Sequence, residues 1–185
     1  MDTRLICVLL LFPLAILADG CSKSSPTGVP DDSNLLTNSS FELNGVPSMQ
    51  GWTIVSGDSS LLFFSSDVPP AGGASSIAFT AGWGPACRIS TMVSAFPGTH
   101  HYRVSVWAKR VGIGGSLRFY LKPANSPWAF RKSLMVTDTV WTAYSMTDSL
   151  ATTGGDSLVV SISGGISQLL SGTTFYDLCE LEKLD

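Results

Sequence analysis

The sequence lacks the clustered basic residues that a nucleic-acid-binding surface needs. Its densest basic groups are two pairs, Lys109-Arg110 and Arg131-Lys132, and the whole chain carries a net charge of −3. Neutralising a phosphate backbone takes several neighbouring Lys and Arg side chains. We therefore expect no nucleic-acid partner.

Catalytic motifs are also missing. The sequence contains no HExxH zinc motif, no P-loop and no dinucleotide-binding fingerprint, and it places no carboxylate pair convincingly for glycoside hydrolysis. Residues 155–158 spell the GDSL motif of a hydrolase family, in which the serine lies near the start of the domain and the histidine follows it. Here the motif lies near the C-terminus, and the only histidines, His100 and His101, precede it. We predict that the protein is not an enzyme.

No long segment shows helical periodicity, and short runs rich in β-branched and aromatic residues occur instead. Turn signals such as Pro97-Gly98, Gly154-Gly155 and Gly164-Gly165 separate these runs at the spacing of ~8–12 residues that is typical of sandwiches and barrels. We expect strands at 60–65, 76–80, 87–93, 102–109, 116–122, 132–136, 142–146, 157–163 and 174–181. This number of strands needs two sheets to bury its faces, so the predicted fold class is all-β, an antiparallel β-sandwich of the jelly-roll kind.

The first twenty residues predict a cleaved export signal. Arg4 precedes the stretch 6–17, which is apolar apart from Pro13. This stretch has the length of the hydrophobic region of a signal peptide and is too short to span a bilayer.

Residues 17–21, Leu-Ala-Asp-Gly-Cys, resemble the bacterial lipobox, whose cysteine is lipidated and becomes the new N-terminus. The resemblance implies a lipoprotein signal peptide at 1–20, with Cys21 anchoring the protein to the cell envelope, at the outer membrane or cell surface. Asp19 departs from the motif, so ordinary cleavage near Ala18 or Gly20 and a plain secreted protein are the alternative. Residues 21–33 are polar and rich in Ser, Pro and Asp, as expected of a short flexible tether.

Five motifs in the remaining residues, 34–185, occur in the order found in one family. They are Asn34-Leu35-Leu36-Thr37-Asn38-Ser39-Ser40-Phe41-Glu42, Gly51-Trp52, the stretch from Pro97-Gly98 to Trp107-Ala108-Lys109, Trp141-Thr142-Ala143-Tyr144, and Phe175-Tyr176-Asp177-Leu178. Together they resemble the jelly-roll carbohydrate-binding modules related to families 4, 9, 16 and 22, which are galactose-binding-domain-like. The resemblance implies a jelly-roll β-sandwich over 34–185 and carbohydrate as the partner.

The resemblance also implies a structural Ca²⁺ near the strand ends, where Glu42 and Asp177 match the family pattern. Carboxylates are ligands of the kind that Ca²⁺ takes, and the turn at 72–75 could add backbone carbonyls. The family usually has a second Asp where this sequence has Leu178. Alternatively, Glu42 caps a loop and Asp177 pairs with a basic side chain.

Sugar binding would depend on aromatic faces that stack on sugar rings and on polar side chains beside them. Trp52 and Trp141 stand at motif positions that the family buries, so we expect both in the core. Two other tryptophans stand in turn-rich segments and are the predicted platforms, and four further residues could line a sheet face between them: Trp83 and Trp128, then Trp107, Tyr120, Arg118 and Arg103. The alternative for all six is packing against loops or the second sheet.

Cys87 and Cys179 remain once Cys7 in the signal and Cys21 at the anchor are set aside. An even number of cysteines in an oxidising compartment favours a disulfide, with two inert buried thiols as the alternative. From these features we expect a monomeric, non-catalytic surface lipoprotein that captures poly- or oligosaccharide. The alternative is an adhesion or structural module that uses the same sandwich without binding sugar.

Overall fold

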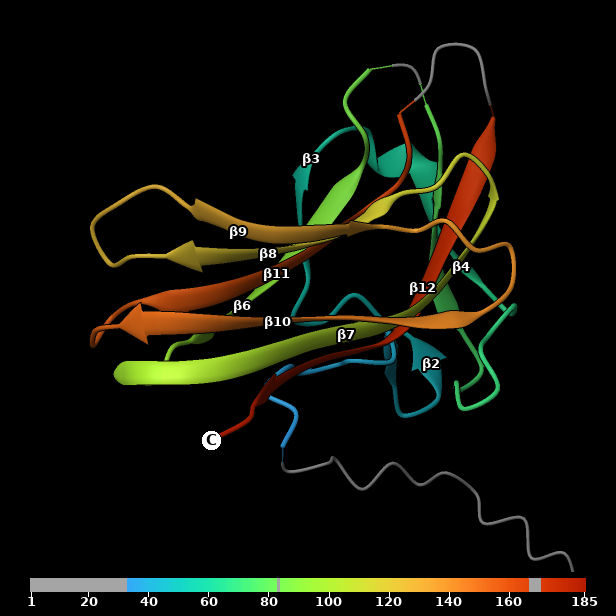
Figure 1. The fold of residues 1–185 in the computed structure, drawn as a ribbon. Coiled ribbons are helices and arrows are strands. Elements are labelled where there is room, and N and C mark those ends of the chain that lie inside the picture. The colour runs from blue at the N-terminus through green and yellow to red at the C-terminus, as the bar shows by residue number, and fades with distance from the viewer. Residues whose placement is uncertain (1–32, 83, 167–170) are drawn as a thin grey trace, which may run out of the picture.

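The structure is a computed structural model that describes residues 33–82, 84–166 and 171–185. Two five-stranded antiparallel sheets pack face to face, and both ends of the described chain lie on the same side of the sandwich (Figure 1). The all-β antiparallel sandwich predicted from the sequence is therefore confirmed. The described ranges contain no helix that is long and apolar enough to cross a membrane.

Each sheet is built from strands that are distant in sequence. The first sheet, called the β7 sheet below, has the order β10 (Thr142–Thr152), β7 (Gly98–Gly112), β12 (Gly172–Lys183), β5 (Ser76–Thr80) and β4 (Leu62–Ser65). The second, called the β8 sheet, has the order β3 (Thr53–Ser56), β6 (Arg88–Ser94), β11 (Ser157–Ser163), β8 (Ser116–Lys122) and β9 (Ala129–Met135). A two-stranded hairpin, β1 (Glu42–Leu43) and β2 (Val46–Pro47), and a 3-10 turn, η1 (Ser59–Leu61), complete the elements.

The core lies between the two sheets and takes every second side chain of the central strands. Leu117 and Phe119 of β8 are 1 % exposed and pack in one cluster with Val104 and Val106 of β7. Since side chains alternate across a strand, the intervening residues of β8 point away from the core. Arg118 and Tyr120 are therefore on the outer face of the β8 sheet.

One tyrosine links the sheets through the core. Tyr176 of β12 is fully buried, and its phenol donates a hydrogen bond to the Ser163 carbonyl of β11 at 2.8 Å. Burial raises the pKa of this phenol well above its usual range. Gly115 lies against the same pair, since a Cβ at this position would lie 2.5 Å from the Tyr176 hydroxyl and would overlap the Ser163 carbonyl.

Ion pairs join the two sheets along one edge of the sandwich. Arg131 of β9 donates through Nε to Asp148 of β10 at 2.8 Å, and the Lys132 ammonium donates to the Thr147 carbonyl. These contacts connect the edge strand of one sheet to the edge strand of the other.

The disulfide expected between Cys87 and Cys179 is wrong, because both are free, buried thiols. Cys87 directly precedes β6 in one sheet, whereas Cys179 is in β12 of the other. Both belong to the apolar core, and burial raises the pKa of each thiol. The alternative of two buried thiols therefore describes them.

We expect Gly115→Ala to lower the free energy of unfolding by about 1–3 kcal/mol, because the new methyl group would overlap backbone in a filled core. Gly154→Ala is the matched control, since a Cβ there would meet nothing within 4 Å. Urea unfolding of both variants measures the difference. Equal midpoints for the two variants would contradict this account of the core.

Candidate functional site

The outer face of the β8 sheet carries its side chains in rows that run across the strands. We call this surface the β8 face. Strand pairing sets one row as Arg88, Ser163, Ser116 and Met135, the next as Ser90, Ser161, Arg118 and Ser133, and the third as Met92, Val159, Tyr120 and Phe130. Two rows of hydroxyls and cations therefore lie beside one apolar, aromatic row.

Two aromatic residues of the third row, Tyr120 and Phe130, form a cluster with Trp128, which directly precedes β9. Tyr120 lies with its ring centroid 5.7 Å from that of Trp128 and 5.8 Å from that of Phe130. Trp128 is 38 % exposed and Phe130 is 59 % exposed, whereas Tyr120 is only 9 % exposed beneath them. Tyr120 thus supports two rings that solvent, or a ligand, can reach.

Arg118 lies beside this cluster in a small hollow of about 220 Å³. Its Nε donates to the Ser116 hydroxyl at 3.1 Å, and that hydroxyl lies 3.0 Å from the Ser163 hydroxyl. Within the described residues, neither Nη group has a hydrogen-bond acceptor. The guanidinium is therefore oriented through Nε while its two outer nitrogens remain free to donate.

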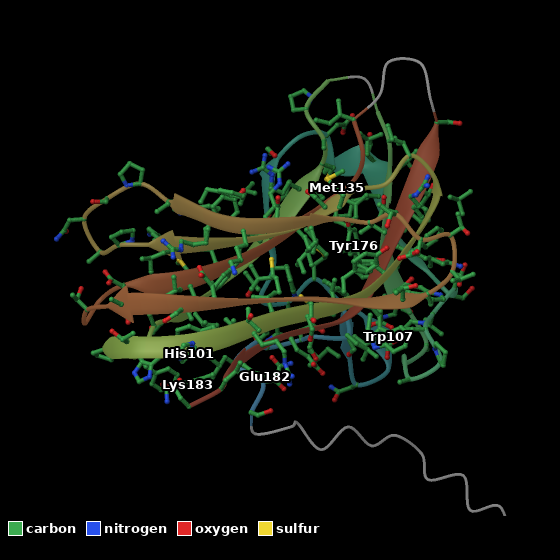
Figure 2. All side chains as sticks on the ribbon, viewed as in Figure 1. His101, Trp107, Met135, Tyr176, Glu182 and Lys183 are labelled. Atoms are coloured by element: carbon green, nitrogen blue, oxygen red, sulfur yellow. The ribbon has the colours of Figure 1, made fainter. Side chains whose placement is uncertain are left out.

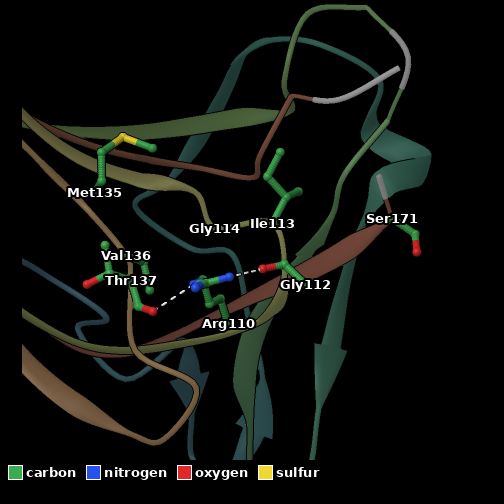
Figure 3. Close-up of a pocket in the computed structure, with 8 residues that line it drawn as sticks. All are labelled: Arg110, Gly112, Ile113, Gly114, Met135, Val136, Thr137 and Ser171. Carbon is green, nitrogen blue, oxygen red and sulfur yellow. Dashed lines mark hydrogen bonds between the residues drawn. The ribbon is translucent and has the colours of Figure 1, made fainter. Parts of the chain in front are cut away.

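A second hollow, of about 480 Å³, adjoins the first at Ile113, Gly114 and Met135 (Figure 3). Arg110 contributes its guanidinium, whose Nε donates to the Thr137 carbonyl at 2.7 Å and whose Nη1 donates to the Gly112 carbonyl. These bonds use the guanidinium to hold two turns together. We therefore assign Arg110 a structural role.

Three of the six predicted sugar-binding residues come together on the β8 face: Trp128, Tyr120 and Arg118. The expectation that Trp107 and Arg103 share this face is wrong, because β7 belongs to the other sheet. Figure 2 shows Trp107 and Met135 on opposite sides of the sandwich. There Trp107 is half-buried, and Arg103 Nε donates to Glu182 at 2.7 Å. Trp83 lies outside the described residues.

Two residues of the third row, Phe130 and Met92, were not predicted from the sequence. Met92 is 51 % exposed and pairs through Val159 with Tyr120. The alternation of side chains along their strands could have placed Met92 and Phe130 on the outer face. Their position beside Tyr120 follows only from the strand register, which requires knowing which strands are neighbours.

The two tryptophans expected in the core differ. Trp52 is 6 % exposed and packs on Phe41, which confirms that prediction. The expectation that Trp141 lies in the core is wrong, since Trp141 is half-buried on the outside of the β7 sheet. Its indole donates to Asp67 at 3.0 Å, and the Lys109 ammonium lies 5.4 Å from its ring centroid.

Glu42 and Asp177 lie against one turn, although 134 positions separate them in the sequence. A Cβ on Gly72 would lie 2.5 Å from Asp177 Oδ2, and one on Gly73 would overlap the Glu42 carboxylate. The Ser75 amide donates to Glu42, and the Leu178 amide donates to Asp177 Oδ1 at 2.8 Å. The turn at 72–75 therefore brings the two carboxylates together.

Asp177 is fully buried, and its Oδ2 has no hydrogen-bond partner among the described residues. Burial, together with the nearby charge of Glu42, raises the pKa of this carboxyl to about 7, although the hydrogen bond from the Leu178 amide acts to lower it. A buried oxygen without a partner beside a second carboxylate suits a cation. The described residues hold no group of three or more His, Cys, Asp or Glu side chains, so backbone or water oxygens would complete such a site.

Asp156 of the GDSL tetrapeptide has a structural role. Its carboxylate accepts the Thr153 amide at 2.7 Å and the Ala124 amide at 3.1 Å, and these bonds lower its pKa. The histidines lie elsewhere: His100 contacts Asp185 at 3.1 Å on the β7 sheet. The tetrapeptide therefore does not pair with a histidine as in the hydrolases.

Comparisons with known proteins find similarity in structure. No protein-family model matches the sequence, and no curated protein matches it. The fold is similar to a family 61 carbohydrate-binding module solved in complex with β-1,4-galactotriose, with 19 % identity, a TM-score of 0.53, and coverage of 81 % of this chain and 98 % of that one.

Two further structures extend the comparison. A family 16 carbohydrate-binding module is 16 % identical with a TM-score of 0.56, covering 80 % of this chain and 99 % of that one. The enzymatically active domain of a tailspike protein from bacteriophage CBA120 is 14 % identical with a TM-score of 0.60, covering 82 % of this chain but 22 % of that one. The chain therefore has the jelly-roll fold of carbohydrate-binding modules.

Proposed function

We propose that the protein is a non-catalytic carbohydrate-binding lipoprotein that captures poly- or oligosaccharide on the β8 face. The observation that carries the proposal is the ring cluster of Tyr120, Trp128 and Phe130, with two exposed aromatic rings beside a row of hydroxyls. Apolar ring faces suit the C–H faces of a sugar, and the Arg118 guanidinium and the exposed Ser133 hydroxyl suit its oxygens. The carbohydrate-binding modules of similar fold support the same reading.

The absence of a catalytic role is part of this proposal. The GDSL tetrapeptide supports it, since its serine, Ser157, is in the β8 sheet, whereas His100 and His101 are in the β7 sheet. On the β8 face, the rows of side chains contain no carboxylate that could act as a general acid or base.

A structural calcium ion at Glu42 and Asp177 is also proposed. These two carboxylates would hold the ion together with oxygens of the turn at 72–75. The ion would neutralise their charges and supply a partner for Asp177 Oδ2, which lacks one. In this role calcium would join the N-terminal hairpin and the β4–β5 turn to β12.

Export and lipidation at Cys21 remain proposals from the sequence, because Cys21 lies outside the described residues. The membrane would be contacted through the N-terminal lipid, and the protein would act as a monomer at the outer membrane or cell surface. The predicted tether would end at this domain where Asn34 pairs with Glu182 of β12.

Trp128→Ala and Phe130→Ala should each weaken polysaccharide binding about tenfold, because each removes an exposed stacking ring. Affinity gel electrophoresis with a panel of polysaccharides measures the change. Trp141→Ala is the matched control, since it removes a tryptophan from the opposite sheet and should bind like the wild type. If no polysaccharide slows the migration of the wild type or of either variant, the result would favour the adhesion role instead.

Calcium should raise the Tm, and a chelator should lower it, because the ion binds only the folded pair of carboxylates. In chelator, the raised pKa of Asp177 stabilises the folded state below about pH 4, and this contribution is lost as the pH rises through about 7. Asp177→Asn should abolish the calcium response and flatten this decline. Glu180→Gln, on the same strand, should retain both, and an unchanged Tm with calcium in the wild type would contradict the site.

Cys21→Ser should move the protein from the membrane fraction to the soluble exported fraction of the producing bacterium, because the lipid acceptor is lost. Mass spectrometry of the wild-type mature N-terminus should find a diacylated or triacylated cysteine at position 21. An unmodified N-terminus near residue 19 or 21 would show cleavage by the ordinary signal peptidase.

A further inference from the structure

The strands of the β8 sheet contain no acidic residue. Basic residues in the same five strands are Arg88, Arg118, Lys122, Arg131 and Lys132. In the β7 sheet the two signs balance, with Asp148, Asp177, Glu180 and Glu182 against Arg103, Lys109, Arg110 and Lys183. A chain of net charge −3 thus keeps one sheet free of negative side chains.

Three of these cations lie on the β8 face without an ion-pair partner among the described residues. Arg131 and Lys132 differ, because both lie within 4.0 Å of Asp148 at the sandwich edge. Arg88, Arg118 and Lys122 form no salt bridge within the described ranges, and all three are half-buried. Their charges are therefore available to a ligand on this surface.

The positions of the cations follow the aromatic row. On β8, Arg118 and Lys122 each stand two residues from Tyr120, on either side of it, at roughly 7 Å along the strand. Arg88 lies beyond Arg118, in the row that contains Ser163 and Ser116. A polysaccharide stacked on the aromatic rings would therefore meet positively charged side chains on both sides of the rings.

The same strands contain no Asn or Gln, so their side-chain acceptors are only hydroxyl oxygens. Neutral sugars present hydroxyl groups that donate as well as accept, and carboxylate or amide oxygens are the groups that would accept from them. Of the serines in the three rows, Ser133 alone is exposed, so the accessible polar groups are mainly guanidinium and ammonium groups, which suit a ligand rich in acceptors. Carboxylate and sulfate groups are acceptors of this kind, and Arg binds them through paired Nη donors.

We propose that the β8 face selects an anionic polysaccharide, one that carries carboxylate or sulfate groups along its chain. The inference rests on the proposed sugar-binding function and names its ligand class. Arg118, oriented through Ser116, donates through its Nη groups to an acidic group on one side of the stacked ring. Lys122 supplies the charge on the other side.

Two pairs of polymers test the proposal, each with one charged and one neutral member. Polygalacturonate is compared with its fully methyl-esterified form, and dextran sulfate with dextran, by affinity gel electrophoresis of the exported protein. We expect the charged member of at least one pair to bind about tenfold or more tightly than its neutral partner. The pair that responds identifies carboxylate or sulfate. Binding should weaken as NaCl rises from about 0.05 to about 0.5 M.

Arg118→Gln and Lys122→Gln should each weaken binding of the charged polymer about fivefold or more, with the Tm unchanged. Lys183→Gln removes the same charge from the β7 sheet and should leave binding unchanged. Phe130→Ala should also weaken it; charged-polymer binding that is insensitive to Phe130→Ala would be ion exchange and would overturn the proposal.

The remaining outcomes distinguish the preference for anionic polymers from the proposed sugar-binding function. Equal binding of charged and neutral members, or binding of neutral polysaccharides alone, would overturn the anionic preference and leave the proposed function intact. Binding to none of these polymers would overturn both.

Discussion

The packing of the two inner faces is the constraint on which the rest of this molecule depends. Leu117 and Phe119 must enter the core, and a strand alternates its side chains with a period of two. Arg118 and Tyr120 are then forced outward into adjacent positions of the β8 face. A slip of one residue in the register of β8 would bury a guanidinium and expose a phenylalanine, so core energetics also hold the binding surface in place.

Much of the fold could be predicted because long strands show their pattern in the sequence. The bounds predicted for β5, β8 and β11 match the structure, and turn signals explain most of the others. The hairpin β1–β2 and the strand β3 were missed, since segments of two to four exposed residues show no alternation. Strand β10 runs on to Thr152 with mostly polar outward residues, which do not differ from a loop in composition.

The candidate site was predictable only within single strands. Tyr120 and Arg118 are two residues apart in one strand, so the alternation of side chains alone places them on the same face. Trp107 and Arg103 were assigned to the wrong sheet, because alternation does not say which sheet a strand joins. The same limit applies to Cys87 and Cys179, since the sequence does not say that they belong to different sheets or that both remain free thiols. Glu42 and Asp177 were found through a resemblance between motifs, and the turn that brings them together carries two glycines where any side chain would collide with a carboxylate.

Strand β12 follows the other described strands in the sequence, yet it lies in the middle of its sheet, between β7 and β5. It also receives the start of the domain, where the Leu35 amide donates to the Leu181 carbonyl at 2.8 Å. The β7 sheet therefore cannot close before β12 has been made, and most of its contacts join distant parts of the sequence. Such topologies fold slowly. During synthesis, this arrangement leaves β7 and β5 without their shared neighbour until β12 has been made.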